Sequence, residues 1–402
     1  MRVDDRVGGA DVGRPEPDAV TDRAGRRLSP WSKSLVYGGA AFVISRLMVL
    51  GAAGVVAAAK QPRPTSAARP ILEVLTSWDG LWYMEVVRRG YPTEVPDPVT
   101  FFHLEARTAF FPLYPALVRW ADAVLPGRDT FAALAVNALF GLLFVLAVGL
   151  LTRDIWGDRA AGRAMVLTAL FPGSFVLSFA YSEPTMLALA AFCLLALQRR
   201  WWLTAGVLAA LATAARPNAV ALVAAAAVAS FLAIRRERDW RSLWAPLLAP
   251  IGFIGYMLFL WHQTGEKTVW FRVQQQAWNE GASFGWTAIR DIFDFVTHPF
   301  DSAVNVITSL SVIAVIVMLV ALWKARPPAP VVAYTLVVVG LMLLPATVTA
   351  RPRFLLTAFP LVIAVAVLWP DEDREWWGML LALCGAGLTG VVVTYGLLAA
   401  IP

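Results

Sequence analysis

Long apolar runs separated by polar connections recur along the chain from about residue 34 to its end. A run of about 20 apolar residues, wound as a helix, can cross a bilayer core of roughly 30 Å. The pattern predicts about eleven spans, at 34–59, 131–151, 163–179, 184–197, 203–215, 218–234, 242–261, 302–323, 331–347, 354–369 and 376–400. The runs near Phe171, Pro184 and Pro217 are short, so a tilted or re-entrant segment is an alternative there. We expect an all-α polytopic membrane protein, because continuous apolar runs do not fit the alternating strands of a membrane barrel.

Two long polar connections interrupt this pattern, at 60–130 and 262–301. Residues 1–30 are rich in Arg, Asp, Gly and Pro and have no apolar core, which predicts a disordered cytoplasmic tail without a cleavable signal peptide. The remainder, 31–402, is expected to form one integral-membrane domain. No internal repeat is visible, whereas paired broken helices in inverted repeats would have favoured a transporter.

Basic residues gather in alternate connections, which predicts the orientation in the membrane. The alternate connections lie on one side of the membrane and contain these basic residues: Arg26, Arg27, Lys33, Arg153, Arg159, Arg163, Arg199, Arg200, Arg235, Arg236, Arg238, Arg241, Lys324 and Arg326. By the positive-inside rule this side is cytoplasmic. Both long polar connections then face outward, together with 181–183, Arg216 and 351–353. This coincidence predicts one extracytoplasmic active site in the plasma membrane.

Composition agrees with a membrane protein and argues against a nucleic-acid partner. Of the 402 residues, 58% are hydrophobic and 15% are charged, whereas soluble domains carry about 25% charged residues. The net charge of +6 is explained by loop arginines rather than by a nucleic-acid surface. Cys193 and Cys384 lie inside apolar runs, which predicts buried inert thiols and neither a disulfide framework nor a metal site.

The first outer loop contains the most informative chemistry, the stretch SWDGLWY at 77–83. A carboxylate among tryptophans and tyrosines is what a sugar-transferring membrane enzyme needs. Asp79 can accept a proton from an acceptor hydroxyl, and flat aromatic rings such as Trp78 and Trp82 can pack against sugars. The spacing predicts a short interfacial helix from Asp79 to about Arg89. A purely structural alternative is that Asp79 caps this helix.

Other polar residues on the predicted outer side are candidates for binding. Arg216, Arg351 and Arg353 can converge on a lipid-linked phosphate, since guanidinium pairs with phosphate oxygens through forked hydrogen bonds. Glu183 beside a span is costly unless it is paired or used. Structural alternatives remain: Arg216 can snorkel, Glu183 can lie in an exposed turn, and Arg107 can be solvated rather than bind phosphate. His103 has no second histidine nearby, which favours a loop histidine without a ligand role. The amides and aromatics of 262–301 suit either sugars or an amphipathic surface helix.

Several short blocks occur in order over about 78–360. They read WD at 78–79, GY at 90–91, AFFPLYP at 109–115, FPG at 171–173, AYSE at 180–183, ARPN at 215–218, a Gln-x-x-x-Trp element within 274–278, and RF at 353–354 followed by Pro360. This ordered set resembles the GPI mannosyltransferase II (PIG-V-type) family and its bacterial relatives in the glycosyltransferase-C superfamily. The alanine-, arginine- and valine-rich composition suggests an actinobacterial-type lineage.

The resemblance implies a polyprenyl-phosphate-mannose-dependent mannosyltransferase with Asp79 as the catalytic base. The implied substrate-binding residues are Trp78, Trp82, Tyr91, Arg107, Tyr181, Glu183, Arg216, Asn218, Gln275, Trp278, Arg351 and Arg353. The implied acceptor is an extracytoplasmic lipid, glycan or protein, such as a bacterial lipoglycan, a phosphoinositide mannoside or a secreted protein. No cofactor is expected, although Asp79 with Glu183 or Glu105 could bind a divalent cation weakly.

Two alternatives stay open at the level of sequence. A flippase or other lipid or sugar transporter would share this composition, but its charges would lie at mid-span rather than at one membrane face. A related transferase could use another prenyl-linked sugar, such as arabinofuranose or glucose, because these residues do not distinguish sugars.

Overall fold

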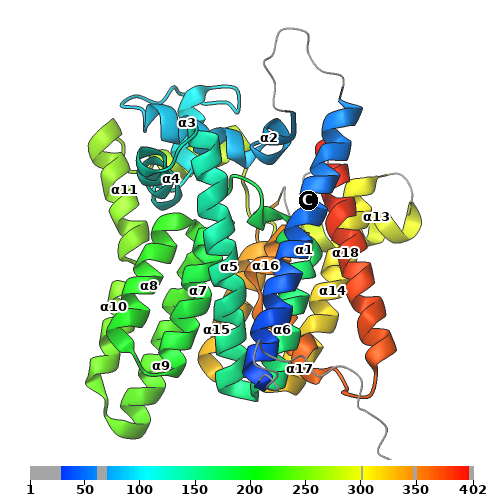
Figure 1. Ribbon diagram of the computed structural model, residues 1–402. Helices are drawn as coiled ribbons and strands as arrows, with labels where there is room; N and C mark the ends of the chain where they lie inside the picture. The colour runs from blue at the N-terminus through cyan, green and yellow to red at the C-terminus, as the bar shows by residue number, and fades with distance from the viewer. Residues whose placement is uncertain (1–28, 61–69, 300–301, 347–350, 398–402) are drawn as a thin grey trace, which may run out of the picture.

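The computed structural model describes residues 29–60, 70–299, 302–346 and 351–397, and helices dominate these ranges. Their β structure is an isolated bridge between Ala282 and Pro345. The bundle is built from α1 (Pro30–Ala59), α5 (Asp129–Trp156), α6 (Asp158–Leu170), α7 (Glu183–Gln198), α8 (Trp202–Ala215), α9 (Ala221–Glu237), α10 (Trp244–Leu248), α11 (Ile251–Thr264), α14 (Ala303–Ala325), α15 (Ala329–Leu343), α16 (Pro352–Thr357), α17 (Pro360–Leu368) and α18 (Arg374–Leu397) (Figure 1). Most of the predicted tail, residues 1–28, lies outside the described residues.

The prediction of an all-α polytopic membrane protein is confirmed. Among the described residues, six helical stretches are long and apolar enough to cross a membrane, at 30–59, 129–156, 217–237, 240–264, 304–325 and 374–397. Shorter apolar helices occupy 183–198, 202–215 and 329–343. All eleven predicted spans therefore correspond to helical segments, while the ends predicted at 347 and 398–400 lie outside the described residues.

Four predicted spans are not single helices, which corrects the sequence-based boundaries. The span predicted at 163–179 is α6 followed by a 3₁₀ turn, η2 (Pro172–Leu177), and 218–234 begins with η3 (Pro217–Val220). The span predicted at 354–369 is divided between α16 and α17, and 242–261 is divided among η4 (Trp240–Leu243), α10 and α11. Proline explains most of these breaks, because it lacks an N–H and favours the first turn of a new helix.

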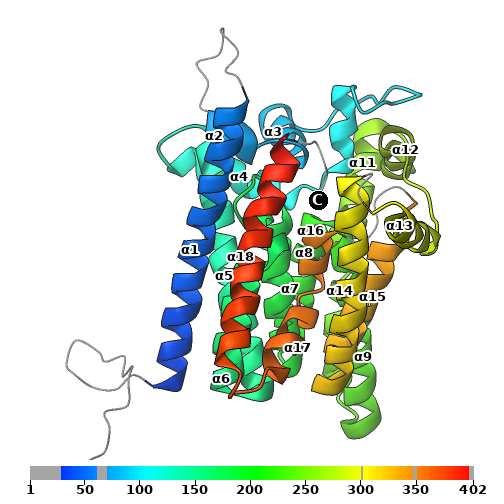
Figure 2. The same cartoon turned by 90° about the vertical axis from the view of Figure 1, so that its right-hand side faces the viewer.

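Both long polar connections fold at the same end of the bundle, the upper end in Figures 1 and 2. The first forms α2 (Pro70–Leu75), α3 (Asp79–Arg89), η1 (Leu104–Ala109) and α4 (Leu113–Val124), and the second forms α12 (Val269–Trp278) and α13 (Trp286–Thr297). The arginine-rich connections that follow α5, α7 and α9 lie at the lower end. This separation agrees with the predicted topology, and the compartment that each end faces stays a prediction.

An aromatic cluster joins the two outer loops. The ring of Trp82 in α3 lies 5.8 Å from that of Trp278 in α12, and both rings pack against Phe110 at 6.1 and 5.7 Å. Phe101 completes the cluster, 5.4 Å from Trp82. Aromatic pairs of this kind contribute about 0.5–1.5 kcal/mol each beyond their buried area. The outer loops therefore form a layer with its own core above the membrane helices.

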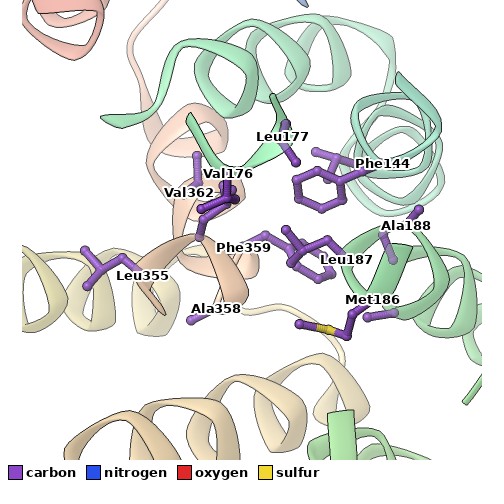
Figure 3. Close-up of a cluster of buried hydrophobic side chains, with 14 of the residues drawn as sticks. Phe144, Val176, Leu177, Met186, Leu187, Ala188, Leu355, Ala358, Phe359 and Val362 are labelled. Atoms are coloured by element: carbon purple, nitrogen blue, oxygen red, sulfur yellow. The ribbon is translucent and has the colours of Figure 1, made fainter. Parts of the chain in front are cut away.

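A second apolar cluster lies inside the bundle and joins four segments (Figure 3). Phe144 of α5 packs edge-to-face on Phe359, between α16 and α17, with ring centroids 5.4 Å apart. Leu177 of η2 and Leu187 of α7 are fully buried in the same cluster. The cluster fixes the positions of α7 and α16, whose first turns contain charged residues.

Gly173 allows η2 and α16 to touch through their backbones. A Cβ atom on Gly173 would overlap the carbonyl oxygen of Pro352, and it would also crowd the nitrogen of Arg353 at 3.2 Å. Backbone atoms cannot rotate away as a side chain can, so only glycine fits at this contact. The sequence FPG at 171–173 is thus a packing requirement of the segment that contains Arg353.

We predict that Gly173→Ala destabilises the protein by about 1–3 kcal/mol, the usual cost of overpacking. The matched control is Gly340→Ala, because nothing lies within 4 Å of the Cβ position at Gly340. Thermal unfolding of both variants in the same detergent measures the difference. If the two variants have the same Tm, the close contact between η2 and α16 is wrong.

Candidate active site

Asp79 begins α3, and its carboxylate pairs with a distant arginine. The predicted helix from Asp79 to Arg89 is confirmed, but its N-cap is Trp78 and no side chain caps it. The capping role considered for Asp79 is therefore wrong. Instead, Asp79 Oδ2 accepts a hydrogen bond from Arg353 Nη1 at 3.0 Å. Arg353 lies in the first turn of α16, so this ion pair joins the first outer loop to the late part of the chain.

The backbone at Trp78 is in a strained conformation that turns the chain into α3. Its φ is 56°, a value that favours glycine, and such strain persists only where the surrounding structure enforces it. The Trp78 ring packs 5.7 Å from that of Tyr395 in α18. Strain at the residue next to a candidate catalytic acid is typical of an active site.

A second ion pair lies beside the first and is more deeply buried. Glu183 Oε2 is 2.6 Å from Arg216 Nη1, with side chains 1% and 12% exposed. Glu183 begins α7 and Arg216 immediately precedes η3, so breaks at Pro184 and Pro217 place both residues. Arg353 interacts electrostatically with Asp79, Glu183 and Arg216. Two acids and two arginines from separate segments therefore share one site.

Hydroxyl groups connect the second ion pair to α3. Ser182 Oγ accepts from Arg216 Nη1 at 3.3 Å and lies 2.5 Å from the hydroxyl of Tyr83. The Tyr181 hydroxyl contacts that of Tyr395 and donates to the Ser77 carbonyl at 3.3 Å. The segment 181–183 is thereby held against both α3 and α18, which keeps the two ion pairs together.

The arginines retain buried donors that no group in the described chain accepts. These atoms are Nε of Arg216, Nε of Arg353, and Nε and Nη1 of Arg351. Burial, with a smaller contribution from Arg353, lowers the pKa of Arg351 to about 10, and Asp291 acts in the opposite direction. Unsatisfied buried donors are costly. A group with several acceptor oxygens, such as a phosphate, can satisfy these donors. Both oxygens of Glu183 are also buried without a hydrogen bond and need donors instead.

The carboxylates of the site pair with arginine side chains. Among the described residues, no group of three or more His, Cys, Asp or Glu side chains is placed to hold a metal ion. Asp79 and Glu183 each face a guanidinium, and Glu105 lies in η1. His103 accepts a hydrogen bond from the Thr100 amide through Nδ1 at 3.2 Å.

Several predicted residues lie outside the charged cluster. Arg107 is buried and donates to the carbonyls of Gly90 and Leu104, both at 2.7 Å, so it braces the first loop. The Tyr91 hydroxyl donates to the Phe110 carbonyl at 2.7 Å. Gln275 is exposed on α12, and Asn218 is half-buried in η3. Trp82 and Trp278 form the aromatic cluster that adjoins α3. Cys193 and Cys384 are buried and free, as predicted.

Arg46 supports the site and is not among the residues that the motifs identify. It donates from α1 to the Ser174 carbonyl at 2.7 Å and to Ser178 Oγ at 2.9 Å, which fixes η2. Arg46 is the single charge in the apolar run 34–59, and an intramembrane charge signals an important site. That signal was available in the sequence. Tyr395, an ordinary tyrosine in the last span, offers no comparable signal.

Comparison with known proteins supports the fold. The family described as dolichyl-phosphate-mannose-protein mannosyltransferase matches residues 111–262, which include Glu183 and Arg216. ArnT from Cupriavidus metallidurans in its apo state is similar in structure, with a TM-score of 0.50 and 16% identity. The match covers 79% of this chain and 63% of ArnT, so this chain spans less than two thirds of that protein. A search of curated proteins found no match.

Two further solved structures resemble the chain more weakly. ArnT bound to undecaprenyl phosphate has a TM-score of 0.47 and 14% identity, covering 84% of this chain and 70% of that one. The apo oligosaccharyltransferase of Archaeoglobus fulgidus has a TM-score of 0.45 and 15% identity, covering 90% and 54%.

The likeness to apo ArnT supports the predicted glycosyltransferase-C fold. The family match covers less than half of this chain. The PIG-V-type assignment and the actinobacterial lineage stay predictions.

We predict that Glu183→Gln destabilises the protein by about 3–5 kcal/mol, because it leaves the Arg216 charge buried without a partner. The double variant Glu183→Gln/Arg216→Gln should regain part of this stability. The matched control is Arg200→Gln, which removes the exposed pair with Glu237 and should cost less than about 1 kcal/mol. Thermal unfolding measures all variants, and strictly additive losses in the double variant would contradict a coupled buried pair.

Proposed function

We propose that this protein is an inverting membrane mannosyltransferase that moves mannose from polyprenyl-phosphate-mannose to an extracytoplasmic acceptor. The observation that carries the proposal is the Asp79–Arg353 ion pair at 3.0 Å, beside the Glu183–Arg216 pair. It brings a carboxylate that can accept a proton next to arginines that can bind a phosphate. The acceptor is a lipoglycan, a phosphoinositide mannoside or a secreted protein.

The buried arginine donors support a lipid phosphate as the leaving group. Arg351 and Arg353 are 7% and 8% exposed and retain unused N–H groups. A phosphate offers several acceptor oxygens and a negative charge, so it satisfies both the hydrogen bonding and the electrostatics of this position. The matched family is named for a dolichyl-phosphate-mannose donor, which supports both a prenyl-linked phosphate and mannose here.

The reaction is a single displacement at the anomeric carbon. The donor phosphate binds the Arg353 guanidinium and replaces Asp79 as its ion-pair partner. The Asp79 carboxylate is then free to accept a proton. The acceptor hydroxyl attacks the anomeric carbon while its proton moves to Asp79. The bond from that carbon to the phosphate oxygen breaks, and the polyprenyl phosphate leaves with both bonding electrons. Arg353 and Arg216 stabilise its charge, and one displacement inverts the anomeric centre.

We predict that Asp79→Asn lowers the rate of transfer about 10³-fold, because general base catalysis contributes roughly 10²–10⁴. The assay uses purified protein in nanodiscs with radiolabelled polyprenyl-phosphate-mannose and a total lipid and membrane-protein extract as acceptor pool. Glu94→Gln is the matched control, since Glu94 is exposed in the same loop, and it should retain wild-type transfer. The Tm of each variant separates lost chemistry from lost folding.

Three outcomes separate the proposal from its alternatives. Near wild-type transfer by Asp79→Asn would contradict its role as base. Transfer only from another prenyl-linked sugar would keep the mechanism and exclude mannose. No transfer from any such donor would contradict the enzyme and favour a transporter.

A further inference from the structure

Residues of α1, α6 and α18 line a groove. Its basic residues come from the parts of α1 and α6 at the lower end of the bundle in Figure 2, away from the candidate active site. It has a volume of about 720 Å³. Its walls are mostly apolar and include Tyr37, Ala40, Ile44, Val166 and Leu381. Tyr37 and Ile44 are 49% and 53% exposed. In a membrane protein such a face contacts lipid chains.

The mouth of the groove is basic. Lys33, Arg159 and Arg163 all line it, and they come from α1 and α6. Their acidic neighbour is Asp371, which pairs with Arg163 at 2.8 Å and also with Arg159. The groove lining contains these three cations and no carboxylate, so the lining itself has an excess of positive charge. Asp371 belongs to an exposed acidic connection that also contains Glu372, Asp373 and Glu375. The nearby carboxylate of Asp158 does not reduce this excess, because it pairs with Arg153 at 2.6 Å.

The groove is a fixed depression with an interfacial rim. α1 and α6 touch at its base, where Ser34 Oγ donates to the Asp158 carbonyl at 2.8 Å and a Cβ atom on Gly162 would crowd Ser34 Oγ at 2.7 Å. At the rim, the Arg163 guanidinium lies over the Trp377 ring, 5.8 Å from its centroid. Tryptophan and arginine together are typical of the headgroup level of a bilayer.

We propose that this groove binds an anionic phospholipid of the phosphatidylglycerol type. Its phosphate lies at Lys33 and Arg159, and one acyl chain follows the apolar wall past Ala40 and Ile44. Charge complementarity selects this occupant, because a zwitterionic lipid would leave the excess positive charge uncompensated. Basic pockets between membrane helices bind anionic headgroups in this way. The site is separate from the proposed donor site, which lies toward the other end of the bundle.

Native mass spectrometry of the full chain, titrated with dioleoylphosphatidylglycerol or dioleoylphosphatidylcholine, tests the proposal. The wild type should bind phosphatidylglycerol preferentially. Lys33→Gln/Arg159→Gln should weaken that binding about 25-fold, since each basic residue near an anionic lipid contributes about fivefold. Arg163 is left intact because it also donates to the Trp369 carbonyl. Ala40→Phe, which fills the apolar wall, should weaken binding without changing any charge.

The matched control is Arg235→Gln/Arg236→Gln, which removes two exposed arginines at the same end of the bundle. It should bind phosphatidylglycerol as the wild type does. Equal affinity for both lipids, an unchanged affinity in Lys33→Gln/Arg159→Gln, or an equal loss in the control variant would each overturn the proposal. Unchanged Tm values without added lipid show that the variants fold.

Discussion

Charges in or beside an apolar interior must find partners, and four buried or half-buried charges determine how this protein is assembled at its candidate site. Asp79, Glu183, Arg216 and Arg353 lie in or just before the first turns of four separate helical segments. Leaving the buried Glu183 or Arg353 without a partner would cost several kcal/mol. The two ion pairs therefore require α3, α7, η3 and α16 to meet at one place, with the charges at helix starts rather than at mid-span.

Packing in the rest of the bundle keeps these four charges at fixed positions relative to one another. The apolar cluster around Phe144 and Phe359 supports α7 and α16 from below, and Gly173 permits direct backbone contact between η2 and α16. Arg46 fixes η2 from α1, and Tyr395 contacts both Trp78 and Tyr181 from α18. The outer aromatic layer covers the same end of the bundle. A rigid, water-poor setting is where oriented charges act most strongly on a reacting group.

The sequence predicts the membrane class, the short helix at 79–89 and the blocks that contain the charged residues, because each has a local signal. It does not predict pairing, since the contact of Asp79 with Arg353 joins residues 274 positions apart. The sequence also does not predict that Arg107 and Tyr91 brace the first outer loop. A motif shows the residue type but not its partner, so an arginine that binds phosphate cannot be distinguished from one that binds backbone carbonyls. Hydropathy does not predict the helix breaks at η2 and α16, because it reports apolarity and not the effect of proline on a helix.

The most direct test of this account is an experimental structure of the protein with a polyprenyl phosphate bound. The account predicts that the phosphate lies within hydrogen-bonding distance of the Arg353 guanidinium, close to Arg351, and that Asp79 has separated from Arg353. A phosphate bound elsewhere, with the Asp79–Arg353 pair still closed at 3.0 Å, would contradict the claim that this ion pair marks the donor site.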